Sequence, residues 1–238
     1  CRPVGGGRLA TPPGARAERD MGWSGRSRPP RRGDRASDLE SPGVGAERPE
    51  VAVDVAAVIQ AVINGNSFAA EFRQLTDHQF AVTGGHLDMV YDTYYLVGGQ
   101  RFDGRYNPMG NPTYTQTYTN AVRKFRINDD GTNLSVTHLP GHTDANNLHR
   151  RDYNVASQIL PNGQEGLTAF SGVFQVGIDL PYLNSVNIDS TSYAVNANFN
   201  QYYNHYHCAV LPAYSATDNE MHTVFFGGIA QYFDSLGT

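Results

Sequence analysis

Thr223-Val-Phe-Phe-Gly-Gly228 and Tyr94-Tyr-Leu-Val-Gly-Gly99 decide the fold class of this chain. In each, a run of apolar, β-forming residues leads directly into two glycines, and Phe80-Ala-Val-Thr-Gly-Gly85 is a looser version of the same pattern. An apolar run of this length predicts a buried strand. Two glycines at its end allow a sharp bend, or an approach too close for a Cβ atom. Because the pattern recurs, the sequence predicts a repeated β-unit.

The first copy of this unit is predicted to contain four antiparallel strands, at residues 86–91, 94–97, 121–127 and 133–139. Asn128-Asp-Asp-Gly131 lies between the last two, and an Asp-Gly pair between two strand-like runs indicates a tight hairpin. Residues 100–120 are polar and aromatic, and we expect them to form a long loop between the second and third strands.

The second copy begins at Tyr153 and the third at His207, which is 54 residues later. Ser171-Gly172 stands where the second copy should have its Gly-Gly pair. A repeat of four strands with a period of about 50 residues is typical of a propeller blade. The strands of these two copies are predicted at residues 153–160, 166–174, 183–188 and 193–197, and at 207–214 and 221–228.

These features resemble the kelch-repeat β-propellers, in which an apolar strand ends in Gly-Gly and a Tyr and a Trp follow on later strands. Phe125 occupies the Tyr position of the first copy and Leu134 the Trp position, and the chain has no Trp after Trp23. In its Tyr-, Asn- and Gly-rich loops the chain resembles secreted kelch-type proteins of Bacteroidota. The resemblance implies an all-β fold: a kelch-like β-propeller fragment of about three four-stranded antiparallel blades, and an extracellular or cell-surface location.

Composition divides the chain into two unlike parts, residues 1–50 and 51–238. The first part is rich in Arg, Gly and Pro and contains no Lys, Phe or Tyr, so it cannot bury enough apolar surface to offset the entropy of ordering. We interpret it as a disordered tail, foreign or artefactual in origin, and the rest as a partial propeller.

Charge and hydropathy narrow the classes of partner. Residues 1–50 carry a net charge of +3 and the remainder −8. An acidic β-body disfavours nucleic acid as a partner. The basic tail does not indicate nucleic-acid binding either, because no nucleic-acid-binding module accompanies its arginines. No apolar run approaches the ~18 residues of a membrane span, so membrane insertion is not expected. Residues 54–63 are apolar but shorter, and either a strand pair around Asn64-Gly65 or a short amphipathic helix fits them.

Alternate turns of an antiparallel blade share a face, which predicts one candidate binding surface. It gathers the 100–120 loop, the 140–152 connection and the 196–205 connection, which are rich in Tyr, planar amides and a few charges. Such surfaces suit a protein, peptide or glycan ligand, although long loops also use these residues simply to turn. The candidate ligand-binding residues are Arg101 and Arg150 for anionic groups, and Tyr203 and His205 for stacking and hydrogen bonding.

The same surface contains one weak metal pattern. His205-Tyr-His207 has the i, i+2 spacing that places two imidazoles on one side of a strand, with His149 or Asp152 as a third ligand. Histidines hydrogen-bonded inside the fold explain the spacing equally well, and we predict neither a metal nor a cofactor. We find no catalytic motif, so the leading interpretation is a non-catalytic recognition or scaffold propeller. The alternative is an enzyme of the copper radical oxidase or sugar mutarotase type on the same fold.

Overall fold

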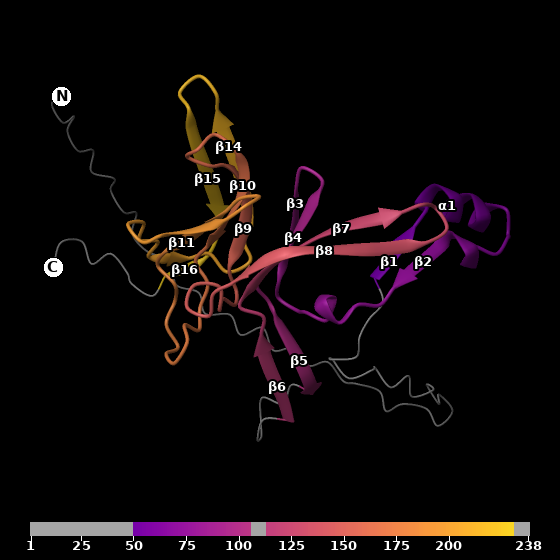
Figure 1. Cartoon of the computed structure of the whole chain (residues 1–238), viewed down its shortest axis with the longest axis horizontal. Coiled ribbons are helices and arrows are strands. Elements are labelled where there is room, and N and C mark those ends of the chain that lie inside the picture. Colours follow the sequence, from indigo (N-terminus) through magenta and orange to yellow (C-terminus); the bar gives the residue numbers. More distant parts are fainter. Residues whose placement is uncertain (1–49, 106–112, 231–238) are drawn as a thin grey trace, which may run out of the picture. The chain divides into compact units, whose positions relative to one another are not determined.

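The computed structural model describes residues 50–105 and 113–230 (Figure 1). These residues form mostly β-structure, arranged in antiparallel sheets of two to four strands, which confirms the β-rich part of the predicted fold class. Within the described ranges none of the sheets closes on itself, so the arrangement of blades around a propeller axis stays a prediction. The tail predicted over residues 1–50 lies outside the described residues, apart from Glu50.

The first four-stranded sheet has the order β3-β4-β7-β8, and it contains the four antiparallel strands predicted for the first copy. Thr93, Tyr95 and Val97 of β4 are buried in strict alternation, as expected for an inner strand. Between Val122 and Lys124 the pairing of β7 with β8 shifts by a β-bulge. The bounds are β3 His86–Val90, β4 Thr93–Val97, β7 Ala121–Asp129 and β8 Leu134–Thr143.

The second four-stranded sheet has the order β12-β11-β10-β9 and confirms the second predicted unit. Two further pairs follow it: the hairpin β14–β15, which matches the strand pair predicted for the third copy, and the short pair β13–β16. The bounds are β9 Asn154–Ile159, β10 Glu165–Phe170, β11 Ser185–Ile188, β12 Tyr193–Asn196, β13 Tyr203–Asn204, β14 Ala209–Ser215, β15 Glu220–Phe226 and β16 Ile229–Ala230.

The apolar core lies between the two four-stranded sheets. Tyr153, which immediately precedes β9, extends through this core to the first sheet. Its side chain is fully buried, and its hydroxyl donates to the carbonyl of Val97 on β4 at 2.5 Å. Nε2 of His86 lies 2.7 Å from the carbonyl of Tyr153, which adds a hydrogen bond in the opposite direction. The two sheets are therefore joined by both packing and buried hydrogen bonds. The core residues are Val90, Tyr95, Val97, Val122, Leu148, Tyr153, Leu167, Ala169, Val186 and Ile188.

The glycine pairs occupy the backbone conformation that their position in the sequence predicts. Gly98 and Gly99 have φ of 59° and 81°, which is the left-handed region. A Cβ atom on Gly98 would collide with the hydroxyl of Tyr153, and one on Gly99 would lie 2.8 Å from the backbone of Gly85. Both the bend and the close approach therefore require glycine at the end of β4.

The segment before the first sheet resolves the alternatives that the sequence left open. Residues 55–63 form helix α1 (Val55–Ile63) rather than a strand pair. The carboxylate of Asp54 accepts a hydrogen bond from the amide of Ala57 at 2.9 Å, which is an N-cap interaction. The flanking strands β1 (Glu50–Val53) and β2 (Phe72–Leu75) pair with each other, and two short 3-10 turns follow α1: η1 (Ala69–Glu71) and η2 (His78–Phe80).

The prediction of a long loop at residues 100–120 is wrong for the part of this segment that the structure describes. Its two arms form an antiparallel hairpin, β5 (Gln100–Arg105) and β6 (Thr113–Tyr118), and its tip lies outside the described residues. In β6, exposed threonines alternate with half-buried Tyr114, Gln116 and Tyr118. This two-residue period is the strand signal that the polar composition hid.

Candidate functional site

A cavity of about 440 Å³ lies at the surface predicted to bind ligand, and we call it the loop-face cavity. Strand β6 forms one wall, the connection from β8 to β9 forms another, and residues 174–179 between β10 and β11 complete it. These segments are far apart in the sequence, so tertiary structure alone brings them together. The lining residues are Gln116, Tyr118, His149, Arg151, Phe174, Gln175, Gly177, Ile178 and Asp179.

Two ring contacts give the loop-face cavity its shape. Tyr118 stacks on His149 with 3.8 Å between ring centroids. The guanidinium of Arg151 lies 5.2 Å from the centroid of Phe174, within the range of a cation–π contact. The Arg151 side chain stays 40% exposed, with its Nε 3.5 Å from a carboxylate oxygen of Asp152. The arrangement combines flat apolar surface with one cation that solvent reaches.

Burial sets the charges around this cavity. It raises the pKa of Tyr118, an effect that the neighbouring Arg151 partly offsets, so the phenol is neutral at neutral pH. Burial also lowers the pKa of His149, whose Nδ1 lies 2.7 Å from the side-chain oxygen of Asn120. His149 is therefore neutral at neutral pH as well, and Arg151 and Asp179 remain as the charged lining residues.

Arg150, which was predicted to bind ligand, is buried, with 1% of its surface exposed. Its Nε donates to the carbonyl of Asn147 at 2.6 Å, and Nη1 donates to the carbonyls of Ser171 at 2.5 Å and Asn184 at 3.0 Å. Nη2 donates to the side-chain oxygen of Asn184 at 2.5 Å, and the guanidinium lies 4.3 Å from the Tyr182 ring centroid. Burial lowers the pKa of Arg150 to about 10. Its position gives it a structural role, which is to hold three chain segments together.

Arg101 lies on β5, where its Nε is 2.9 Å from a carboxylate oxygen of Asp103. Both side chains are exposed, and neither lines the loop-face cavity. The ion pair therefore lies on β5, whereas the cavity is lined by Gln116 and Tyr118 of the neighbouring strand β6.

Tyr203 and His205 come from the 196–205 connection, which meets residues 172–183 rather than β6. Tyr203 is exposed. His205 stacks on Phe225 with 4.5 Å between ring centroids, and its Nδ1 lies 2.5 Å from the carbonyl of Gly227. The same connection bonds to the second sheet through the side chain of Asn204, which accepts a hydrogen bond from the amide of Gly172 at 3.2 Å.

The two histidines of the predicted metal pattern have different neighbours. His205 faces Phe225, whereas His207 stacks on His86 at 5.3 Å and its Nε2 lies 3.7 Å from Asp152. In residues 50–105 and 113–230 we find no group of three His, Cys, Asp or Glu side chains that is placed to hold a metal ion. The structure thus does not bring this pattern together into a three-ligand set within those ranges.

Residues 174–179, which form one wall of the loop-face cavity, are absent from the binding surface that the sequence predicts. In the second copy as in the first, the loop between the second and third strands lies on the predicted binding face. Ser171-Gly172 marks the end of β10, so the same rule would have selected Phe174, Gln175 and Asp179.

In comparison with known proteins, no protein-family model matches this chain, and no curated protein matches it significantly. Among the residues that the structure describes, no helix has the length and apolar character needed to cross a bilayer.

Proposed function

We propose that this chain is a non-catalytic recognition module built on kelch-like β-propeller blades, which binds a carboxylate-bearing peptide or glycan in the loop-face cavity. In keeping with the resemblance to secreted kelch-type proteins, we further propose that it acts outside the cell or at its surface. The observation that supports binding most directly is the placement of Arg151, a cation reached by solvent and flanked by aromatic side chains.

The chemistry of the lining favours a ligand with both a negative charge and a flat or apolar part. A guanidinium binds a carboxylate through two parallel hydrogen bonds, and Arg151 is the lining residue able to do so. The stacked pair of Tyr118 and His149 provides rigid surface beside it at little entropic cost. The side chain of Gln175 adds amide hydrogen bonding.

The test is a binding array of uronate-containing oligosaccharides and acidic peptides, followed by titration of the best binder from each arm. Because a central Arg anchor typically contributes about 2 kcal/mol, Arg151→Gln is expected to weaken binding about thirtyfold. Raising the salt concentration should weaken binding to the parent protein and have less effect on the variant.

Arg126→Gln is the matched control, because Arg126 is an exposed arginine of β7 that pairs with Asp92 and does not line the cavity. It should bind as the parent does. Equal loss in both variants would indicate a nonspecific charge effect. Unchanged binding by Arg151→Gln would show that the ligand binds elsewhere.

A further inference from the structure

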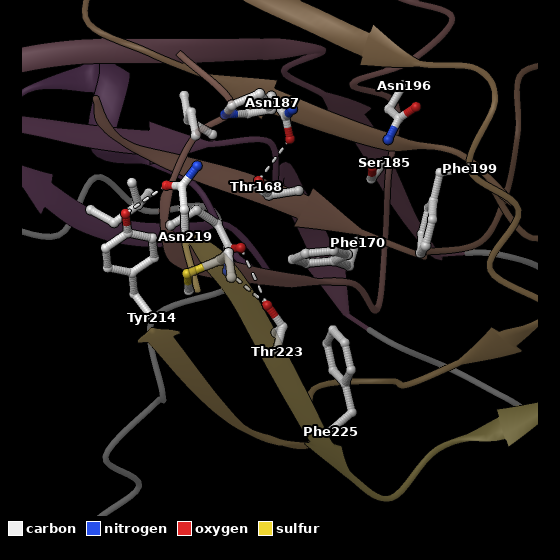
Figure 2. Close-up of a pocket in the computed structure, with 15 residues that line it drawn as sticks. Thr168, Phe170, Ser185, Asn187, Asn196, Phe199, Tyr214, Asn219, Thr223 and Phe225 are labelled. Atoms are coloured by element: carbon white, nitrogen blue, oxygen red, sulfur yellow. Dashed lines mark hydrogen bonds between the residues drawn. The ribbon is translucent and has the colours of Figure 1, made fainter. Parts of the chain in front are cut away.

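A second cavity, of about 630 Å³, lies between sheet β9–β12 and hairpin β14–β15 (Figure 2). Its volume is within the range of about 300–1,000 Å³ that is typical of small-molecule sites. It has no lining residue in common with the loop-face cavity. The lining residues are Gln158, Ile159, Leu160, Pro161, Thr168, Phe170, Ser185, Asn187, Asn196, Phe199, Tyr214, Asn219, Met221, Thr223 and Phe225.

The two faces of sheet β9–β12 differ in kind. On the face toward the first sheet, β10 and β11 present Leu167, Ala169 and Val186, which are fully buried in the apolar core. On the face toward the hairpin, the same strands present the polar Thr168 and Asn187 beside Phe170. Because burying polar groups costs free energy, an interface built only for packing would be apolar on both faces. Part of this polar surface pairs internally, since Gln158 of β9 donates to the hydroxyl of Thr223 on β15 at 2.9 Å, and the rest faces a cavity that water or a ligand can occupy.

The charge of the lining limits the ligand class. Among the described residues that line this second cavity, there is no Asp, Glu, Lys, Arg or His. The loop-face cavity, in contrast, contains Arg151, His149 and Asp179. A site without side chains that carry a charge at neutral pH favours a neutral ligand, since a bound charge would lose its hydration without gaining a counter-charge.

The amides of the cavity have hydrogen-bonding capacity left over. Asn187 accepts a hydrogen bond from the hydroxyl of Thr168 at 2.8 Å, and Asn219 accepts one from the hydroxyl of Tyr214 at 2.8 Å. Each bond uses one polar atom of the amide, and the other atom stays available to a ligand. Figure 2 shows Asn219 beside the Tyr214 ring, Asn187 beside Thr168, and Asn196 near Phe199.

Aromatic rings line the other part of the cavity. Phe170 and Phe225 meet edge to face, with centroids 5.2 Å apart, and Figure 2 shows Phe199 near them. A ring face packs well against the C–H groups of a pyranose, and amides pair with its hydroxyls. Aromatic rings and neutral amides together thus match the two chemically distinct parts of a sugar ring.

We propose that this cavity is a second binding site, specific for a short neutral saccharide that lies against Phe199 and Phe170 and bonds to the amides of Asn187, Asn196 and Asn219. This site is independent of the carboxylate site proposed for the loop face. The protein thereby has one site for a charged ligand and one for a neutral ligand.

The probe is a panel of neutral trisaccharides: maltotriose, cellotriose, xylotriose, mannotriose and laminaritriose. Binding to the full chain is measured by saturation-transfer NMR and calorimetry at millimolar ligand. At least one member is expected to bind, and both Phe199→Ala and Asn196→Ala should weaken that binding by about tenfold or more. These two side chains lie at the rim of the fold, with Phe199 39% exposed, so both variants should keep the parent's thermal midpoint.

Two control variants separate this proposal from its alternatives. Phe226→Ala removes an exposed phenylalanine from the other face of β15, and Arg151→Gln alters the loop-face cavity; both should bind the saccharide as the parent does. The proposal is overturned if no trisaccharide binds. It is also overturned if folded Phe199→Ala and Asn196→Ala bind as tightly as the parent, or if Arg151→Gln abolishes the binding.

Discussion

At the scale of single residues, a pair of residues with positive φ follows the second strand of all three predicted copies. Gly98-Gly99, Ser171-Gly172 and Gly227-Gly228 each place two successive residues at positive φ. Ser171 is the exception in residue type, with φ of 53° for an L-residue that rarely adopts it. Its side chain is fully buried, and its hydroxyl has no hydrogen-bond partner within the described structure.

Ser171→Gly is therefore expected to stabilise the protein by about 1 kcal/mol, because it removes backbone strain and a buried unsatisfied hydroxyl. The greater freedom of glycine in the unfolded chain offsets part of this gain. Urea denaturation measures the change. Ser171→Ala is the matched control, since it removes the hydroxyl but keeps the strain, and should stabilise less. A destabilised Ser171→Gly would contradict the strain argument.

Gly98→Ala should cost about 3 kcal/mol or more, because a left-handed alanine costs 1–2 kcal/mol and its Cβ would also collide with the buried Tyr153 hydroxyl. Gly65 is a matched control: it has φ of 66° and no atom near the position of a Cβ. Gly65→Ala should therefore show the strain cost alone. Equal losses in the two variants, compared by thermal unfolding, would show that the contact with Tyr153 is unimportant.

At the scale of elements, Arg150 joins segments that the strands themselves leave unconnected. Its guanidinium bonds to the connection before β9, to the end of β10 and to the start of β11. These three segments also position Arg151 and Phe174 at the loop-face cavity. A buried arginine thus acts on the candidate site by fixing the loops around it, without contacting the ligand.

Arg150→Met keeps the side-chain volume but leaves buried carbonyls without donors, so a loss of about 3 kcal/mol is expected. Arg126→Met, at the exposed pair with Asp92, should change stability by less than about 0.5 kcal/mol. Chemical denaturation of both variants makes the comparison. A fully stable Arg150→Met would remove the structural role assigned to this residue.

At the scale of the whole described molecule, sheet β9–β12 packs against the first four-stranded sheet on one face and lies opposite hairpin β14–β15 on the other. Toward the first sheet it forms an apolar core, and toward hairpin β14–β15 it leaves a cavity lined by both polar and aromatic side chains. Histidines lie at the junctions of these elements. His86 forms a hydrogen bond with the carbonyl of Tyr153, and His207 stacks on His86. The charge state of His86 therefore affects the contact between the two sheets.

Burial, together with the nearby His207, lowers the pKa of His86 below its ordinary value of 6.5. The unfolded chain therefore binds a proton more readily than the folded one, and the stability contributed by neutral His86 is lost as pH falls below that value. Urea midpoints measured between pH 8 and pH 5 should decrease toward acid. His86→Gln should reduce this slope, to which His142 and His149 also contribute because burial lowers their pKa values as well, whereas His222→Gln, at an exposed position on β15, should leave it unchanged. A pH-independent midpoint in the parent would refute the assignment.

The sequence by itself determined the strands of the two four-stranded sheets and of the β14–β15 hairpin. Apolar runs followed by Gly-Gly or Ser-Gly and an Asp-Gly turn located both four-stranded sheets and the β14–β15 hairpin, because strand periodicity and turn chemistry are local properties. Where two local patterns competed, the prediction from sequence was wrong or ambiguous. The polar composition of residues 100–120 hid the alternation of β6, and residues 54–63 fitted either a helix or a strand pair.

Only the tertiary structure decided which side chains form the candidate site. Arg150 and Arg151 are adjacent, and in extended chain neighbouring side chains point to opposite sides, so the sequence cannot tell which of them faces the interior. Packing against Tyr182 and three carbonyls took Arg150 inside and left Arg151 at the cavity. The face of β10 and β11 that carries Thr168 and Asn187 became a cavity for a related reason: its contact with β14–β15 joins segments far apart in the sequence, such as those of Phe170 and Phe225, and no local pattern specifies that contact.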